Sequence, residues 1–242
     1  MRVALISDLH GNEVALRAVL DDIARVGIDR LVCLGDVATL GPCPGAVIKI
    51  LRELGCTCIM GNHDEFLLDS ELIRSYTEVP PVVAAVDWCR DQIDQDALEF
   101  LRSFVRSVDI TLDNGIKLFL FHGSPRSHME DILATTPVDQ LDQMLDGHHA
   151  TVMAGGHTHI QMLRQHRGIL LVNPGSVGAP FREYAGGKAP VILPHAEYAI
   201  IEEDEGAVRV HLQRVALDKR ALRDAIASTD NPLRDAHLVA YS

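Results

Sequence analysis

The sequence is short of basic residues and has no long apolar run. It carries 22 lysines and arginines against 34 aspartates and glutamates, a formal net charge of -12. Phosphate backbones recruit basic surfaces, so this balance argues against general nucleic-acid binding. No apolar run approaches the roughly 20 residues that span a bilayer. The N-terminal strand turns polar at Ser7-Asp8, too early for a secretory signal. We therefore expect no membrane partner.

Cysteine is also scarce, and its number does not suit a disulfide framework. The five cysteines are an odd number scattered along 242 residues, namely Cys33, Cys43, Cys56, Cys58 and Cys89. This usage is typical of reduced thiols in a cytoplasmic protein. We expect a cytoplasmic location.

The apolar residues that are present, 47% of the chain, suffice for one sizeable core. Strand and helix patterns alternate in the first third of the chain. Strands are predicted at residues 2–7, 30–34 and 57–60, and helices at 12–26 and 44–54. This alternation is typical of βαβ units and a parallel sheet.

The rest of the chain predicts helices and hairpins. Residues 65–103 are expected to form helices in a cap-like insertion. Two hairpins are predicted, at residues 110–121 and 196–215, with further strands at 151–154, 161–165 and 169–172 and helices at 137–145 and 218–227. Together these patterns predict an α/β protein with mixed sheets and helices outside.

Metal-ligand residue types follow the predicted strands. The carboxyl ends of strands in α/β sheets form the rim where ligands bind, so segments far apart in sequence can meet there. Five such segments are present: Asp8-Leu9-His10, Gly35-Asp36, Gly61-Asn62-His63-Asp64, His122-Gly123 and Gly155-Gly156-His157-Thr158-His159. Each alone has an ordinary explanation as a turn, a rim residue or a helix cap. Their joint occurrence predicts one site.

The ligand types indicate the metal. Imidazole, carboxylate and amide oxygen together suit Mn, Fe, Zn, Co or Ni. In extended segments, residues i and i+2 project to the same side, so Asp8 with His10 and His157 with His159 are expected to face one cluster. Seven candidate ligands are too many for one ion, and two ions sharing Asp36 would account for them.

These five segments resemble the blocks of the calcineurin-like metallophosphoesterase superfamily. Residues 35–44 and 173–178 are similar to its small prokaryotic branch, described as phosphoesterases or predicted protein phosphatases. The resemblance implies a four-layer αββα sandwich, with one domain over residues 1–242 and a helical cap-like insertion at about 65–105. It also implies that Asp8, His10 and His159 hold one metal, and Asn62, His122 and His157 the other, with Asp36 between them.

The resemblance also implies a reaction. A hydroxide bridging the two metals would attack a phosphomonoester or phosphodiester, and Asn62 and the metals would bind the phosphoryl oxygens. His63 would be the general acid, with a pKa near the working pH and with Asp64 orienting its imidazole. The residues themselves leave open a plain hydrogen-bonding role for His63 and a helix-capping role for Asp64.

Weaker substrate contacts are expected from Asn173, Arg182 and Arg126, because amides and arginines bind phosphate. A structural turn at Asn173 is an equal alternative. The leading substrate is a small soluble phosphorylated compound, with manganese a suitable metal.

Three other functions compete with this one. A serine/threonine protein phosphatase is disfavoured because the residues after Asp36, Val37-Ala38-Thr39-Leu40, lack the arginine that grips phosphate in those enzymes. An inactive interaction scaffold would not need to keep His63. A nuclease is disfavoured by the acidity of the chain. The insertion after His63-Asp64 is expected to decide among substrates.

Overall fold

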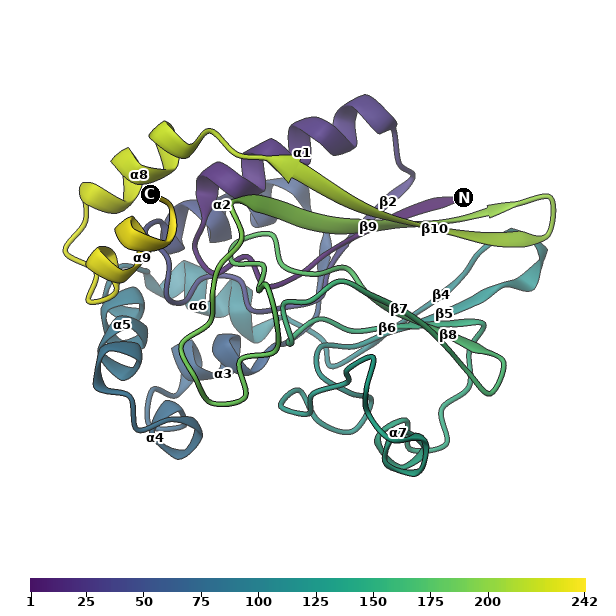
Figure 1. Cartoon of the computed structure of the whole chain (residues 1–242). Coiled ribbons are helices and arrows are strands. Elements are labelled where there is room, and N and C mark those ends of the chain that lie inside the picture. Colours follow the sequence, from purple (N-terminus) through teal and green to yellow (C-terminus); the bar gives the residue numbers. More distant parts are fainter.

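Two five-stranded sheets lie face to face in the computed structural model, which describes residues 1–242 (Figure 1). The first sheet has the order β10-β9-β1-β2-β3. Its strands are β1 (Arg2–Ile6), β2 (Arg30–Cys33), β3 (Thr57–Cys58), β9 (His195–Asp204) and β10 (Ala207–Ala216). The second sheet has the order β4-β5-β6-β8-β7. Its strands are β4 (Val108–Thr111), β5 (Lys117–Leu120), β6 (Val152–Ala154), β7 (Met162–His166) and β8 (Ile169–Asn173).

Both sheets are mixed, as the sequence predicts. Strands β1, β2 and β3 are parallel neighbours, and β9 joins β1 antiparallel with Val3 opposite Ile201. The parallel neighbours are linked by α1 (Glu13–Val26) and α2 (Pro44–Leu54). In the second sheet, β5, β6 and β8 are parallel and the edge strands β4 and β7 are antiparallel.

The core divides into three layers because successive side chains on a strand point to opposite faces of a sheet. Ala4 and Ile6 of β1 pack with α1 and α2 on the outer face of the first sheet. Val3 and Leu5 pack between the sheets. Phe119 of β5 packs on the outer face of the second sheet, against α7 (Val138–Met144). The four-layer αββα sandwich is therefore confirmed.

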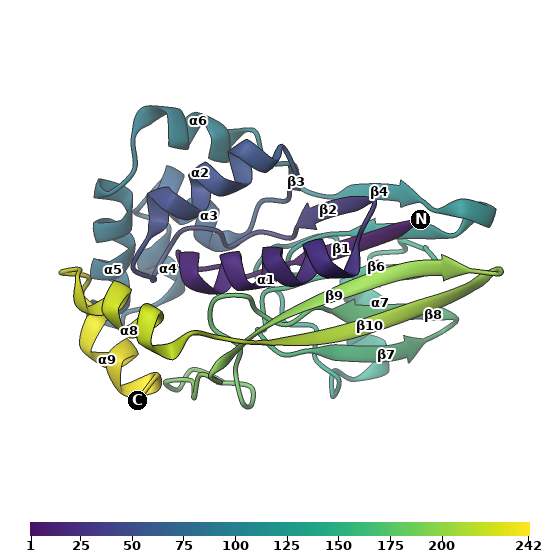
Figure 2. The ribbon, with the colours of Figure 1, turned by 90° about the horizontal axis from the view of Figure 1, so that it is seen from above.

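A group of helices gathers at the end of the sheets where β1 and β2 finish (Figures 1 and 2). Four of them cover the segment expected to be a helical insertion: α3 (Asn62–Leu68), α4 (Ile73–Tyr76), α5 (Pro80–Asp91) and α6 (Gln95–Arg102). The other two are α8 (Lys219–Ala227) and α9 (Arg234–Ala240).

Two details differ from the sequence-based expectations. Helix α8 is not the last helix, because α9 follows it and contributes Tyr241, just past its end, to a small apolar cluster with Leu222 and Ile226. The hairpin β9–β10 is longer than expected, with ten residues in each strand. No helix has the length and apolar character needed to cross a membrane.

Candidate metal centre

The predicted ligand segments meet at the carboxyl ends of β1 and β2. The loop after β1 lies on the loop after β2, since the Asp8 amide donates to Gly35 O at 2.9 Å and the His10 amide donates to Asp36 O at 3.0 Å. The His157 amide donates to Oδ2 of Asp8 at 3.0 Å, which joins the second sheet to the same place. Segments about 150 residues apart thus form one buried site.

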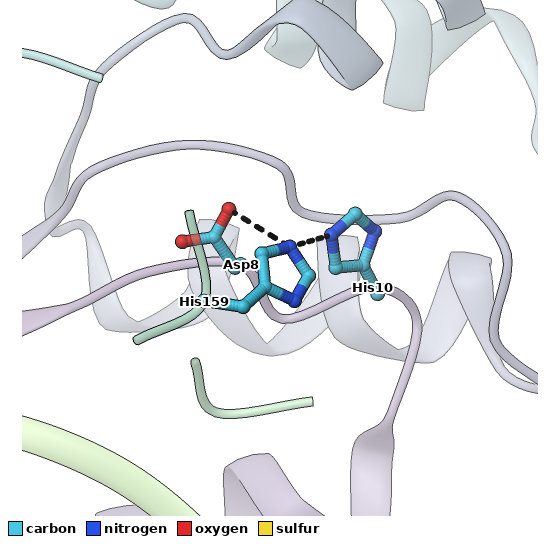
Figure 3. Close-up of side chains that lie close together, drawn as sticks. All are labelled: Asp8, His10 and His159. Carbon is cyan, nitrogen blue, oxygen red and sulfur yellow. Dashed lines mark hydrogen bonds and ion pairs between the residues drawn. The ribbon is translucent and has the colours of Figure 1, made fainter. Parts of the chain in front are cut away.

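The first cluster contains Asp8, His10 and His159, whose ligand atoms all lie within 4.8 Å of one another (Figure 3). Nε2 of His159 lies 3.0 Å from Nε2 of His10 and 3.4 Å from Oδ1 of Asp8. Nδ1 of His159 is 2.7 Å from the carbonyl oxygen of Ala179, so it carries the proton and Nε2 keeps a lone pair. Two imidazole nitrogens this close need a proton or a cation between them.

The second cluster contains Asp36, His122 and His157, again with ligand atoms within 4.8 Å. Nδ1 of His122 donates to Leu34 O at 2.7 Å, which leaves its Nε2 as the free ligand atom. Asn62 begins α3 beside this cluster, because the next residue, His63, donates its amide to Oδ1 of Asp36 at 2.9 Å.

Asp36 lies between the two clusters. Its Oδ2 is 3.4 Å from Nε2 of His122 in the second cluster and 3.9 Å from Nε2 of His10 in the first. Its other oxygen, Oδ1, accepts the His63 amide. One carboxylate oxygen therefore faces both clusters.

Several buried polar atoms here have no partner within the protein. They are Oδ1 of Asp8, Nε2 of His122 and both amide atoms of Asn62. Buried polar groups are nearly always hydrogen-bonded, and ones that converge in this way point to a group that occupies the site. The donor set of imidazole, carboxylate and amide oxygen fits a borderline divalent cation in each cluster.

The electrostatics favour the same conclusion. Burial lowers the pKa of His157 to about 3, and it lowers that of His10 well below its usual value. Burial also acts to lower the pKa of His122, but the Asp36 carboxylate outweighs it and raises that pKa to about 9. The buried Asp36 carboxylate thus attracts positive charge to this position.

The backbone at the site departs from the extended conformation that we expected. Asp8, His10, Asp36, His157 and His159 all have positive φ, between 44° and 67°. Non-glycine residues rarely adopt this conformation, and such strain collects at functional sites. The paired ligands therefore do not converge through i, i+2 alternation. Asp8 and His10 do share the first cluster, but His157 lies in the second cluster and His159 in the first.

Two glycines allow the ligands to approach the backbone. A Cβ on Gly61 would meet the amide nitrogen of Asp36 at 2.6 Å, and one on Gly156 would lie 2.7 Å from Oδ2 of Asp8. Neither carboxylate could keep its position beside a larger residue.

The prediction that Asp64 orients His63 is wrong. The Asp64 carboxylate accepts the backbone amides of Asp36, Val37 and Gly61 at 2.8 to 2.9 Å, so it joins the loop of Asp36 to the start of α3. This is close to the helix-capping alternative that the sequence left open.

Thr39 makes the contact that was expected of Asp64. Its Oγ1 lies 2.9 Å from Nδ1 of His63 and 3.2 Å from Nδ1 of His10. Burial lowers the pKa of His63 to about 4, and the near-neutral pKa expected of a working general acid stays a prediction. His63 is therefore a neutral imidazole at pH 7.

The weaker substrate candidates fare unequally. The prediction that Asn173 contacts substrate is wrong, because its buried amide donates to Gly156 O and Thr158 Oγ1 and accepts the Gly175 amide. Arg126 is bound to Glu130 through two nitrogens. Arg182 lies exposed with its guanidinium 3.4 Å from Glu183, and its role stays a prediction.

Three residues near the site went unnoticed in the sequence. Besides Thr39 they are Tyr76 of α4, whose ring centroid is 6.1 Å from that of His63, and Asp131, whose Oδ1 is 3.4 Å from Nε2 of His157. They belong to no ligand motif and come from loops or from the insertion, so only the fold brings them to the site. Tyr76 shows that the insertion contributes to the wall beside His63.

Comparison with known proteins agrees with this architecture. A family model described as the calcineurin-like phosphoesterase superfamily domain matches residues 1–194. The chain is 29% identical over 245 residues to uncharacterized protein MJ0912 of Methanocaldococcus jannaschii, covering 95% of this chain and 93% of that protein. It is 28% identical to phosphodiesterase YfcE of Escherichia coli, covering 74% of this chain and 81% of that protein.

Solved structures give the same result. A metallophosphoesterase from Sphaerobacter thermophilus superposes with a TM-score of 0.72 at 25% identity, covering 100% of this chain and 98% of that one. The hypothetical protein PH1004 from Pyrococcus horikoshii superposes with a TM-score of 0.81 at 21% identity, covering 98% and 97%. The family match spans most of the chain and every ligand segment. The chain belongs to the calcineurin-like phosphoesterase superfamily, a family of metal-dependent hydrolases.

Proposed function

We propose that the chain hydrolyses a small phosphoester with two divalent transition-metal ions, one in each cluster. The observation that carries this proposal is the place of Asp36, whose Oδ2 faces His122 on one side and His10 on the other. Asp8, His10 and His159 would hold one ion, Asn62, His122 and His157 the other, and Asp36 both. The similarity to a protein named as a phosphodiesterase supports a diester among the substrates.

The two ions would supply a nucleophile at neutral pH and would neutralise charge on the phosphoryl group. The chain's own residues set the conditions for this. The ligands are buried, so their charges act in a medium of low polarity where they are effective. Asn62 has a free amide nitrogen, which suits it to donate to a phosphoryl oxygen.

His63 is the candidate general acid, and Thr39 determines which of its nitrogens carries the proton. If Nε2 of His10 holds a metal, its Nδ1–H donates to the Thr39 hydroxyl. The Thr39 hydroxyl then donates its single proton in a hydrogen bond to Nδ1 of His63. His63 is then left with its proton on Nε2, where it can hydrogen-bond to a leaving oxygen. Transfer of that proton requires the imidazolium form, in which Nδ1–H would donate to the Thr39 hydroxyl instead.

A catalytically inactive scaffold fits these observations less well. Both ligand clusters are complete, and His63 is buried and hydrogen-bonded beside them. An interaction surface has no use for five ligands in a strained backbone conformation.

The test of the proposal is Asp36→Asn. It keeps the shape of the side chain but removes the shared anionic oxygen. We expect bound manganese to fall below two ions per chain. Turnover of bis-p-nitrophenyl phosphate should fall more than about 100-fold, a larger loss than when a residue that only hydrogen-bonds to a metal ligand is removed. Wild-type protein should also melt at higher temperature with added manganese, whereas the variant should respond less.

The matched control is Asp109→Asn, the same change at an exposed position of β4. It should leave metal content and turnover unaltered. Full activity of Asp36→Asn in manganese-replete buffer would exclude the two-metal proposal.

A further inference from the structure

The inference concerns an acidic residue outside the ligand set. Asp131 lies in the loop between β5 and α7, with Oδ1 3.4 Å from Nε2 of His157 in the second cluster. Its side chain is 37% exposed, whereas that of His157 is 6% exposed. Asp131 therefore lies at the solvent-facing side of the cluster, where a substrate must enter.

Asp131 is held in this place by a second loop. The hydroxyl of Tyr184 donates to Oδ2 of Asp131 at 2.7 Å. Tyr184 lies between β8 and β9, on the segment that also places Phe181 against the ring of His159, with centroids 4.2 Å apart. The carboxylate thus has one oxygen toward the metal ligand and the other tied to the opposite loop.

Tyr76 of the helical insertion faces the same space. Burial raises its pKa to about 12, and the carboxylates of Asp36 and Asp131 add to this effect. Its ring packs near His63 and Phe66 while the residue stays 44% exposed. The entrance therefore combines an aromatic wall beside the general-acid candidate with a carboxylate beside the second cluster.

Positive side chains around this entrance do not offset the carboxylate. On the Asp131 loop, Arg126 is bound to Glu130 through two nitrogens. On the Tyr184 loop, Arg182 lies beside Glu183. His128, the other basic residue of the first loop, lies 3.2 Å from Glu65. These three groups have acidic partners, and the remaining lysine of the two loops, Lys188, is exposed to solvent and makes no ion pair.

We infer that Asp131 makes the site selective for a singly charged phosphodiester over a doubly charged phosphomonoester. This rests on the proposed phosphoesterase function. Two divalent cations would bring four positive charges. Asp8, Asp36 and the attacking hydroxide would cancel three of them, and Asp131 the fourth. A monoester is a dianion above its second pKa of about 6, whereas a diester stays a monoanion. The extra charge of the monoester meets the Asp131 carboxylate at a partly exposed position, where solvent screens part of the repulsion.

The experiment compares Asp131→Asn with the wild type at pH 8, using bis-p-nitrophenyl phosphate and p-nitrophenyl phosphate, which share one leaving group. The substitution removes the charge at a partly exposed position. We expect the ratio of kcat/KM for monoester over diester to rise roughly tenfold. Tyr184→Phe keeps the charge but frees the carboxylate, so it should change the ratio much less.

A second readout does not depend on turnover. Calorimetric titration of the manganese-loaded protein should show Asp131→Asn binding inorganic phosphate roughly tenfold more tightly, with dimethyl phosphate little changed. Asp139→Asn is the matched control, because it removes one negative charge from the exposed part of α7. It should alter neither readout.

The outcomes separate the two proposals. An unchanged ratio in an active Asp131→Asn enzyme overturns the inference and leaves the phosphoesterase proposal standing. Equal losses on both substrates together with lower manganese content also overturn it, because Asp131 would then act only by positioning His157. If no variant hydrolyses either substrate, the phosphoesterase proposal fails, and the binding titration alone decides whether Asp131 discriminates by charge.

Discussion

The side-chain hydroxyl of Thr39 lies 2.9 Å from Nδ1 of His63. The same oxygen lies 3.2 Å from Nδ1 of His10, so one hydroxyl connects a metal-ligand candidate to the candidate general acid. Since a hydroxyl has one proton to donate, it cannot donate to both rings at once. The tautomer of His63 is therefore coupled to the state of His10.

Thr39→Val should weaken leaving-group protonation while keeping the shape of the side chain. It removes both hydrogen bonds, so His63 loses its preferred tautomer and orientation. For a diester with an unsubstituted phenyl leaving group we expect kcat to fall about tenfold. This is less than the roughly 10²- to 10⁴-fold effect of a general acid, because His63 itself remains. For the p-nitrophenyl diester, whose leaving group needs little protonation, we expect less than about a twofold change.

Thr39→Ser is the matched control, because it restores the hydroxyl and should recover activity with the phenyl diester. His63→Ala should show the same dependence on leaving group as Thr39→Val, only stronger. Equal losses on both diesters in Thr39→Val would mean that Thr39 supports the structure alone.

Metal affinity should depend on pH through His122. The Asp36 carboxylate outweighs burial and raises the pKa of His122 to about 9, so the metal-free protein carries a proton there at pH 7.5. A metal must displace that proton, and its affinity should rise about tenfold per pH unit up to about pH 9. Because burial lowers the pKa values of His10 and His157, these two rings are already neutral and release none.

Calorimetry of manganese binding in two buffers of different ionisation enthalpy measures this proton release. At pH 7.5 we expect about one proton per chain from the second cluster. Affinity that does not change between pH 7 and pH 9 would contradict the assignment of His122 as a ligand.

Gly156→Ala should displace a ligand without touching any ligand residue. The new Cβ would lie 2.7 Å from Oδ2 of Asp8 and still closer to Oγ of Ser7, so the Asp8 carboxylate must move. We expect manganese affinity to fall at least about tenfold, a loss comparable to removing an outer-shell partner.

Gly45→Ala, in α2, is its control. The nearest atom that a Cβ there would meet is the backbone oxygen of Gln92, 3.5 Å away. It should leave metal content unchanged, and alanine in a helix should slightly stabilise the protein. Unaltered metal binding by Gly156→Ala would show that Asp8 does not need this close contact.

Much of the fold could be predicted because its pattern is local. Residues 44–54 carry a helical apolar pattern with Pro44 at the start and Gly55 after the end, and α2 has these bounds. The predicted helix at 12–26 begins one residue later, with Asn12 as its cap, accepting the Ala15 amide. Helix α9 was missed because it is seven residues long and none of them is buried.

The site was predictable as a set of residues but not as a geometry. Strand ends brought Asp8 and Asp36 together because the parallel strands β1 and β2 finish at one edge of the first sheet, and His157 joins them from the end of β6 in the facing sheet. Aspartate and histidine adopt a left-handed backbone more often than most residues but still rarely, so the extended conformation was the natural expectation. The Thr39 contact joins residues 24 positions apart across a loop, and a threonine there has many ordinary explanations.

The backbone of Asp8, the first candidate ligand along the chain, is held by residues far later in the sequence. The carbonyl of Asp8 accepts Oγ–H of Ser176 at 2.7 Å and the amide of Gly178 at 3.0 Å. The strand before it, β1, is flanked by β9, which begins at His195. A growing polypeptide that has exposed only Asp8, His10 and Asp36 therefore lacks the surroundings that hold these residues in place. Since chains emerge from the ribosome N-terminus first, we expect the protein to acquire its metals only near the end of synthesis, when almost the whole chain is available to fold.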